Sequence, residues 1–235
     1  MKPSEGKKGM ARRIWEIDFL RVFAICLMIV YHFAYDLNAI LGVSVNFESG
    51  FWYWYSKLSA IFIFVSGISA GFSRNVLRNG IKLLVVAAGI SAVTYFFLGD
   101  LFIKFGVIHF LGVSMLLYLL LRKLNVWILG GLATGIALLT STVRQTTVNT
   151  WLLLPLGFTY PGFRSEDYFP LFPYLAVFIA GIIAYKLYYY KGRSLFKFNL
   201  ESRLLEKISR NSLLIYVLHQ PVLMGLLLLY KYLAP

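Results

Sequence analysis

One apolar stretch near the start of the chain, DFLRVFAICLMIVYHFAYD, carries four ionisable side chains: Asp18, Arg21, His32 and Asp36. A helix turns about 100° per residue, so all four fall within a sector of about 60°. A charged side chain at the centre of a bilayer costs roughly 2.5–3.5 kcal/mol on insertion scales. We therefore expect this polar face to line a protein interior or a water-filled cavity, which is the first candidate for a functional site.

The two ends of this face predict different chemistry. The imidazole of His32, with an ordinary pKa near 6.5, suits proton transfer, whereas the guanidinium of Arg21 suits anion binding. On a helix the two residues lie about 16 Å apart along the axis, so they would serve opposite ends of one pocket. The simpler interpretation is that Arg21 extends to the lipid headgroups and pairs with Asp18.

All three histidines of the chain fall in apolar stretches: His32, His109 in FGVIHFLG, and His219 in YVLHQP. A single histidine within a membrane is most simply explained as an interhelical hydrogen bond. Three in one small bundle, with His32 and His109 at the same predicted depth, favour a site.

The last apolar stretch repeats the polar face of the first. Its members on one helical sector of about 80° are Ser209, Ser212, Tyr216 and His219. Pro221 then frees a backbone carbonyl within the membrane, which requires a partner or a cavity. Gln220 adds one more polar side chain to this stretch.

The composition predicts a polytopic α-helical membrane protein. The chain has 235 residues, of which 59% are hydrophobic and 17% aromatic, against roughly 45–50% apolar residues in ordinary soluble domains. The net charge of +13 does not indicate nucleic-acid binding, because the basic residues cluster in short segments between apolar runs. The lone cysteine, Cys26, excludes an intrachain disulfide, and without a zinc pattern we expect no metal.

Hydropathy predicts seven membrane spans within a single domain, 14–235, that follows a polar cytoplasmic tail, 1–13. The expected spans are 15–37, 51–72, 81–98, 105–121, 126–142, 169–190 and 211–232. With the N-terminus in the cytoplasm, 17 of the 23 basic residues lie in cytoplasmic segments and 4 in outer ones, which predicts this orientation. The outer segment 143–168 contains TWLLLPLGF, which is too short to span the membrane and is expected to be re-entrant or interfacial.

Two GxxxG pairs predict close helix packing: Gly67 with Gly71, and Gly131 with Gly135. Ser66 and Ser69, beside the first pair, are also candidates to line a pocket. The sequence has no serine-hydrolase elbow, P-loop, GxGxxG or HExxH motif.

The first apolar stretch, with EIDFLR followed by YHF, resembles the opening helix of the transmembrane acyltransferase superfamily. More closely, the chain resembles the prokaryotic relatives of heparan-α-glucosaminide N-acetyltransferase. The segments that carry this resemblance, in order, are FIFVSGIS (62–69), FIKFGVIHFLGVSMLL (102–117), DYFPLFPYLAVFIAGIIAY (167–185) and SRNSLLIYVLHQPVL (209–223). One departure is that the loop 38–50 lacks the histidine that the lysosomal relatives place after the first helix.

The resemblance implies a multi-pass enzyme of the cell membrane that moves an acetyl group from cytoplasmic acetyl-CoA to an amine or hydroxyl of a sugar or glycan at the outer face. In this interpretation His32 is the general base, and Asp36 orients its ring or binds acceptor hydroxyls. His109 is a second base or an oxyanion donor. An acetyl-histidine intermediate stays open as an alternative to direct transfer.

The same resemblance assigns the remaining candidate residues. Contacts to the acetyl-CoA phosphates and tunnel are expected from Arg21, Arg13, Arg74, Arg78, Lys82, Arg210, His219 and Gln220. Acceptor contacts are expected from Asp167, Tyr168 and Asp18. For each basic residue the alternative is the ordinary positive charge of cytoplasmic loops.

Two other classes of function fit parts of the pattern. A proton-coupled transporter or permease of a small polar or anionic solute would also use intramembrane arginine, aspartate and histidine, but the sequence shows no inverted repeat. A membrane assembly subunit would explain the GxxxG pairs but not the polar face. A homodimer is compatible with the sequence, although no motif in the chain requires one.

Overall fold

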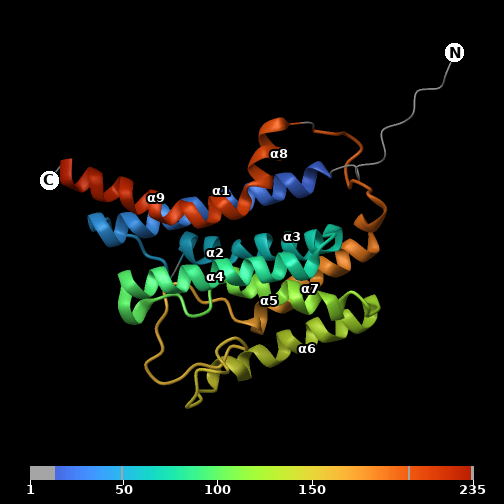
Figure 1. Cartoon of the computed structure of the whole chain (residues 1–235), viewed down its shortest axis with the longest axis horizontal. Helices are drawn as coiled ribbons and strands as arrows, with labels where there is room; N and C mark the ends of the chain where they lie inside the picture. The colour runs from blue at the N-terminus through green and yellow to red at the C-terminus, as the bar shows by residue number, and fades with distance from the viewer. Residues whose placement is uncertain (1–13, 49, 201, 234–235) are drawn as a thin grey trace.

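The computed structural model describes residues 14–48, 50–200 and 202–233, and this part of the chain is helical, without a sheet (Figure 1). Its α-helices are α1 (Trp15–Leu41), α2 (Gly50–Lys57), α3 (Ser59–Phe72), α4 (Val76–Leu98), α5 (Val107–Leu121), α6 (Val126–Gln145), α7 (Leu171–Leu187), α8 (Arg203–Arg210) and α9 (Ser212–Leu233). Two short 3-10 helices follow α4 and α7, at Gly99–Leu101 and Tyr189–Lys191. The predicted tail 1–13 lies outside the described residues.

The helices confirm a polytopic α-helical membrane protein. Five candidate spans are long and apolar enough to cross a bilayer, namely α1, the pair α2–α3, α4, α6 and α9. Two further apolar helices, α5 and α7, have 15 and 17 residues and fall short of the usual spanning length of about 20. Five of the seven predicted spans therefore match full-length candidates, one of which is the pair α2–α3, and two match shorter helices. The count of seven and the orientation of the N-terminus stay predictions.

The first and last spans lie side by side along one flank of the bundle (Figure 1). Helix α3 packs against α7 and also against α1, while α4 packs against α5, so these helices form the middle of the molecule. Helix α6 packs against α7 on the flank opposite α1 and α9. The fold thus joins segments from both ends of the chain along one side, next to the central helices.

Large apolar side chains divide into a packed interior and a lipid-compatible surface. Phe110, Phe178 and Ile182 are fully buried between the central helices. In contrast, Phe97 on α4 and Trp127 on α6 are 83% and 86% exposed. Exposed side chains of this size are expected where a surface faces lipid instead of water.

The first GxxxG pair confirms the prediction of close packing, and the second does not. A Cβ atom at Gly67 would overlap the carbonyl oxygen of Phe178 on α7, and one at Gly71 would overlap the ring of Tyr185. Gly131 and Gly135 on α6 have no neighbouring heavy atom within 4 Å of such a position. Within the described chain the second pair therefore borders open space and makes no close helix contact.

Two connections have structure that the sequence did not specify. The basic connection after α7 contains a helix of its own, α8, which Ser202 caps by accepting a hydrogen bond from the Leu205 amide at 3.3 Å. The segment between α6 and α7 forms turns that pack over the ends of α5 and α7. The Leu171 amide donates to the Pro155 carbonyl at 2.8 Å, and the Phe169 amide donates to the Phe105 carbonyl at 2.9 Å. The apolar stretch TWLLLPLGF is thus a folded surface segment and not a span.

Candidate active site

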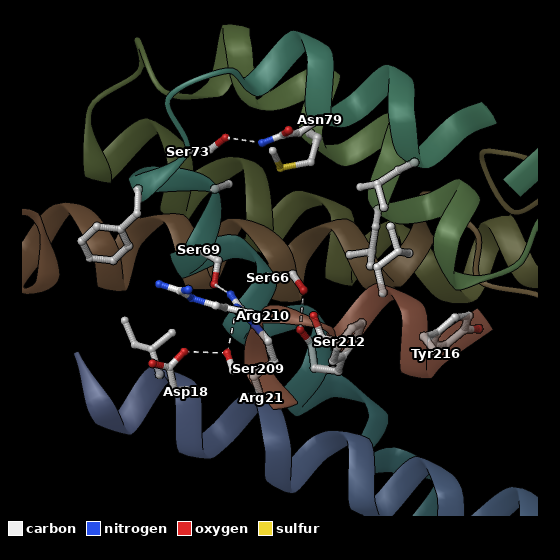
Figure 2. A pocket seen from close by; sticks show the side chains of 18 of the residues that line it. Asp18, Arg21, Ser66, Ser69, Ser73, Asn79, Ser209, Arg210, Ser212 and Tyr216 are labelled. Atoms are coloured by element: carbon white, nitrogen blue, oxygen red, sulfur yellow. Dashed lines mark hydrogen bonds between the residues drawn. The ribbon is translucent and has the colours of Figure 1, made fainter. Parts of the chain in front are cut away.

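A cavity of about 590 Å³ lies between α1, α3, α4, α5 and the C-terminal helices (Figure 2). Its volume falls within the range of about 300–1,000 Å³ that is usual for ligand pockets. One long side is apolar, formed by Ile108, Leu111 and Met115 of α5. The polar lining residues are Asp18, Arg21, Ser66, Ser69, Ser73, Asn79, Lys82, Ser209, Arg210, Ser212 and Tyr216.

Arg21 anchors a hydrogen-bonded network that joins three helices at one end of this cavity. Its guanidinium donates to the hydroxyl of Ser69 at 2.5 Å and to the hydroxyl of Ser209 at 3.0 Å. Ser209 is fully buried and donates in turn to the Asp18 carboxylate at 2.5 Å. The network holds the cationic group at the cavity wall and links α1 to α3 and to the end of α8 (Figure 2).

The predicted phosphate-binding residues divide into two groups. Lys82 and Arg210 line the same cavity as Arg21, which places three cations around it. Arg74 and Arg78 are exposed and do not line it. Arg13 lies outside the described residues.

Tyr216 lines the part of the cavity that is away from Arg21 (Figure 2). Its hydroxyl connects the cavity to the buried carboxylate of Asp167. Its hydroxyl donates to Oδ2 of Asp167 at 3.4 Å, and the Val107 amide at the start of α5 donates to the same atom at 3.0 Å. Burial raises the pKa of Asp167 from 3.8 to about 6, against the two hydrogen bonds that lower it. Asp167 therefore caps the N-terminus of α5 and also accepts a hydrogen bond from Tyr216.

The predicted acceptor residues do not form one cluster. Tyr168 donates through its hydroxyl to the carbonyl of Leu154 at 2.8 Å, within the segment between α6 and α7, and burial raises its pKa to about 12. Asp18 lies with Ser209 and Arg21 at the cationic end of the cavity. This position of Asp18 favours a role beside the cation over the predicted contact with an acceptor.

Beyond Tyr216, helices α1 and α9 bring together two imidazole rings. The ring centroids of His32 and His219 lie 4.9 Å apart. One turn further along α1, the buried Asp36 carboxylate accepts two hydrogen bonds from Nε2 of Gln220, at 2.8 and 3.0 Å. His219 and Gln220, predicted to line a donor tunnel, thus lie against His32 and Asp36.

His109 is held elsewhere, at the start of α5. The Gly106 amide donates to its Nδ1 at 3.2 Å, so Nδ1 carries the lone pair and Nε2 carries the proton. Nε2 lies 3.2 Å from the hydroxyl of Ser91, which itself donates to the Ile103 carbonyl. The structure therefore does not bring His109 beside His32, because His109 caps a helix and the ring next to His32 is that of His219.

Three polar residues that the sequence analysis placed on polar faces or beside a pocket, without a specific role, now belong to the site: Ser69, Ser209 and Tyr216. Ser209 and Tyr216 share the polar face of the last apolar stretch, and Ser69 lies beside the first GxxxG pair. In the sequence, each of these residues is a polar residue within or beside an apolar run. Their contacts to Arg21 and Asp167 depend on how separate helices pack, which no local pattern contains.

The arrangement combines a cation-lined cavity with a pair of imidazole rings just beyond it. The cations could hold the anionic part of an elongated ligand, while the apolar wall of α5 would cover an uncharged arm. Tyr216 lies between this cavity and the imidazole pair, since it contacts the ring of His219 with centroids 5.4 Å apart. Such a site suits the transfer of a group from one bound molecule to another.

Comparison with known protein families gives one match. The family model described as heparan-alpha-glucosaminide N-acetyltransferase, catalytic, matches residues 13–221, which is most of the chain. No curated protein and no solved structure matched the chain.

Proposed function

The chain belongs to the heparan-alpha-glucosaminide N-acetyltransferase catalytic family, and from this premise we propose that it moves an acetyl group from cytoplasmic acetyl-CoA to an amine or hydroxyl of a sugar or glycan at the outer face of the cell membrane. The family and the helical fold make the protein a multi-pass membrane acyltransferase. The donor, the acceptor class and the direction of transfer are the proposed parts.

The single observation that carries the proposal is the position of the cavity between three cations and an imidazole pair. A cytoplasmic donor and an outer acceptor can react only if the protein gives both access to one point within the membrane. The cavity begins near Lys82 and Arg210, at the helix ends predicted to face the cytoplasm, and reaches Tyr216, which contacts His219. Its shape therefore fits a donor that enters from one side and an acceptor that approaches His32 from the other.

The residues present fit acetyl-CoA by charge and by polarity. Arg21, Lys82 and Arg210 would hold phosphate oxygens, for which arginine is particularly suited by its planar set of donors. The α5 wall and Phe62 would cover the pantetheine arm, with the hydroxyls of Ser66 and Ser69 available to its amides. When bound, acetyl-CoA supplies a thioester, an acyl group already activated for transfer.

His32 is the proposed general base. It would take the proton from the acceptor amine or hydroxyl as that group attacks the thioester carbonyl, and return it to the departing sulfur. Asp36 and Gln220 hold α1 against α9 one turn away and so keep the His32 ring in place. Asp167 is proposed to keep Tyr216 in position between the cavity and the imidazole pair.

The experiment that tests the proposal supplies labelled acetyl-CoA to the purified protein, with a panel of amino sugars and polysaccharides as acceptors. Label that appears in an acceptor only when the protein is present supports acetyl transfer. Binding of acetyl-CoA without transfer to any acceptor would contradict it. Proteoliposomes loaded with the same solutes test the rival transporter, for which solute flux without acetylation is the expected result.

A further inference from the structure

The imidazole of His219 presents a basic nitrogen that nothing in the described part of the chain satisfies. Its Nδ1 lies 2.5 Å from the backbone carbonyl of Tyr216. A carbonyl oxygen only accepts hydrogen bonds, so Nδ1 must be the protonated nitrogen. Nε2 is buried and has no hydrogen-bond partner among the described residues.

The protonation of this ring follows from the same geometry. A buried imidazolium would need an acceptor for its second N–H, and the described residues offer none at Nε2. The neutral ring leaves a lone pair there instead. A buried acceptor without a hydrogen bond destabilises the fold and is rare in proteins, so a function that uses this nitrogen would explain its presence.

The group that faces His219 across the helix contact is His32. The two rings are 4.9 Å apart between centroids, and His32 also contacts Tyr31 at 5.9 Å. His219 also contacts the ring of Tyr216, with centroids 5.4 Å apart. None of the described residues, His32 included, makes a hydrogen bond to Nε2 of His219 in this state. Of the two rings in contact with His219, only that of His32 would gain a proton in the proposed reaction, so it is the group that could donate to this lone pair.

We propose that His219 is a positioning residue for acyl transfer, whose Nε2 accepts a hydrogen bond from the imidazolium that His32 becomes during the reaction. This inference rests on the proposed function. The acceptor oxygen or nitrogen forms a bond to the acyl carbon, the carbon–sulfur bond breaks, and the acceptor proton moves to His32. The thiolate that leaves then recovers that proton from His32, so CoA departs as the thiol.

The neutral partner is suited to this role because it adds no second charge. Two imidazolium rings in contact would repel, so the pair holds one additional proton at most. The Tyr216 carbonyl fixes the tautomer of His219, as a hydrogen bond to one ring nitrogen determines the state of the other. The structure thus links the end of the donor cavity, through Tyr216 and His219, to the proposed base.

The first test measures the tautomer in the wild-type protein. Only three histidines are present, so 15N-histidine spectra of the detergent-solubilised chain can be assigned with single substitutions. We expect a protonated Nδ1 and a bare Nε2 for His219 at neutral pH. His109 provides the internal control with the opposite tautomer, a bare Nδ1. A protonated Nε2 on His219 in the wild-type protein would overturn the inference, and the substitutions serve only to assign the signals.

The second test separates the two nitrogens by kinetics. In His219→Asn the side-chain amide can still donate to the Tyr216 carbonyl, but no acceptor remains at the position of Nε2. In His219→Gln the longer side chain places an amide at the position of Nε2, where its oxygen can accept. We expect His219→Asn to lower kcat about 100-fold with little change in the KM of either substrate, and His219→Gln to keep activity within about 10-fold. Wild-type kcat in His219→Asn, or equal losses in both variants, would refute the positioning role.

The third test asks whether His219 acts through His32. In a His32→Gln background the second substitution, His219→Asn, should cost nothing further, because the group it assists is gone. A loss as large as in the wild-type background would exclude action through His32. Absence of transfer by the wild-type protein would refute the proposed function instead, and the tautomer measurement would still decide the state of His219.

Discussion

Gln220 on α9 donates two hydrogen bonds to the Asp36 carboxylate on α1, at 2.8 and 3.0 Å. This contact joins the first and last spans of the chain one turn away from the paired rings of His32 and His219. It fixes the rotation of both helices about their axes, so it determines whether the two imidazoles can meet.

Breaking this contact is expected to loosen the helix pair. Gln220→Leu would leave the buried carboxylate of Asp36 without these donors, and a hydrogen bond to a charged group contributes about 1.5–3 kcal/mol. We expect the free energy of unfolding in detergent to fall by about 2 kcal/mol. The double variant Asp36→Asn, Gln220→Leu should lose less than the sum of the single changes. Additive losses would show that the two side chains are not coupled.

Arg21 is expected to bind the donor. Removing a charge-assisted contact weakens binding by about 10- to 100-fold, so Arg21→Gln should raise the Kd for acetyl-CoA by at least about 10-fold. Ser69→Ala removes one hydrogen-bond partner of Arg21 and should raise the Kd for acetyl-CoA by a smaller factor. The matched control is Arg78→Gln, which removes an exposed cation outside the cavity. Equal effects of Arg21→Gln and Arg78→Gln, measured by calorimetry, would point to general charge and not to a site.

His32→Ala is expected to lose nearly all acetyl transfer while the protein still inserts and binds acetyl-CoA. Loss of a general base lowers the rate by about 10²–10⁴-fold. His109→Gln is the comparison, since His109 caps α5 and should affect stability more than kcat. Transfer at the wild-type rate by His32→Ala, in the labelled acetyl-CoA assay, would remove His32 from the mechanism.

Asp167 should make stability depend on pH in mildly acidic solution. Its pKa is raised in the folded chain, from 3.8 to about 6, because the buried carboxylate is costly to ionise. The unfolded chain therefore loses its proton first, and the stability present below pH 3.8 is lost as the pH rises to about 6. Asp167→Asn keeps an acceptor for the Val107 amide and cannot ionise. Thermal unfolding should show this pH dependence in the wild type and a flatter profile in the variant; matching profiles would contradict the assignment.

The contact between α3 and α7 should tolerate no added side chain at Gly67. Gly67→Ala places a methyl group on top of the Phe178 carbonyl oxygen, so the helices must separate. Overpacking of this kind typically costs about 1–3 kcal/mol. Gly131→Ala makes the same chemical change where no atom lies within 4 Å, and it should leave the Tm in detergent nearly unchanged. Similar Tm values for both variants would argue against the tight contact.

Several features of the protein could be predicted from local sequence. Long apolar runs predict helices in a membrane because the bilayer allows no unsatisfied backbone groups. The shared face of Asp18, Arg21, His32 and Asp36 follows from helical periodicity alone, and α1 presents them on one continuous helix. The cationic end of the cavity was likewise expected from Arg21, Lys82 and Arg210.

Only the tertiary structure decided which residues meet. The partner of His32 is His219 instead of His109, and the partners of Arg21 include serines from α3 and the end of α8. These contacts depend on the rotation and depth at which separate helices pack. Hydropathy and periodicity describe each helix by itself and leave both quantities open, so the sequence determined what the polar face contains and packing determined what it faces.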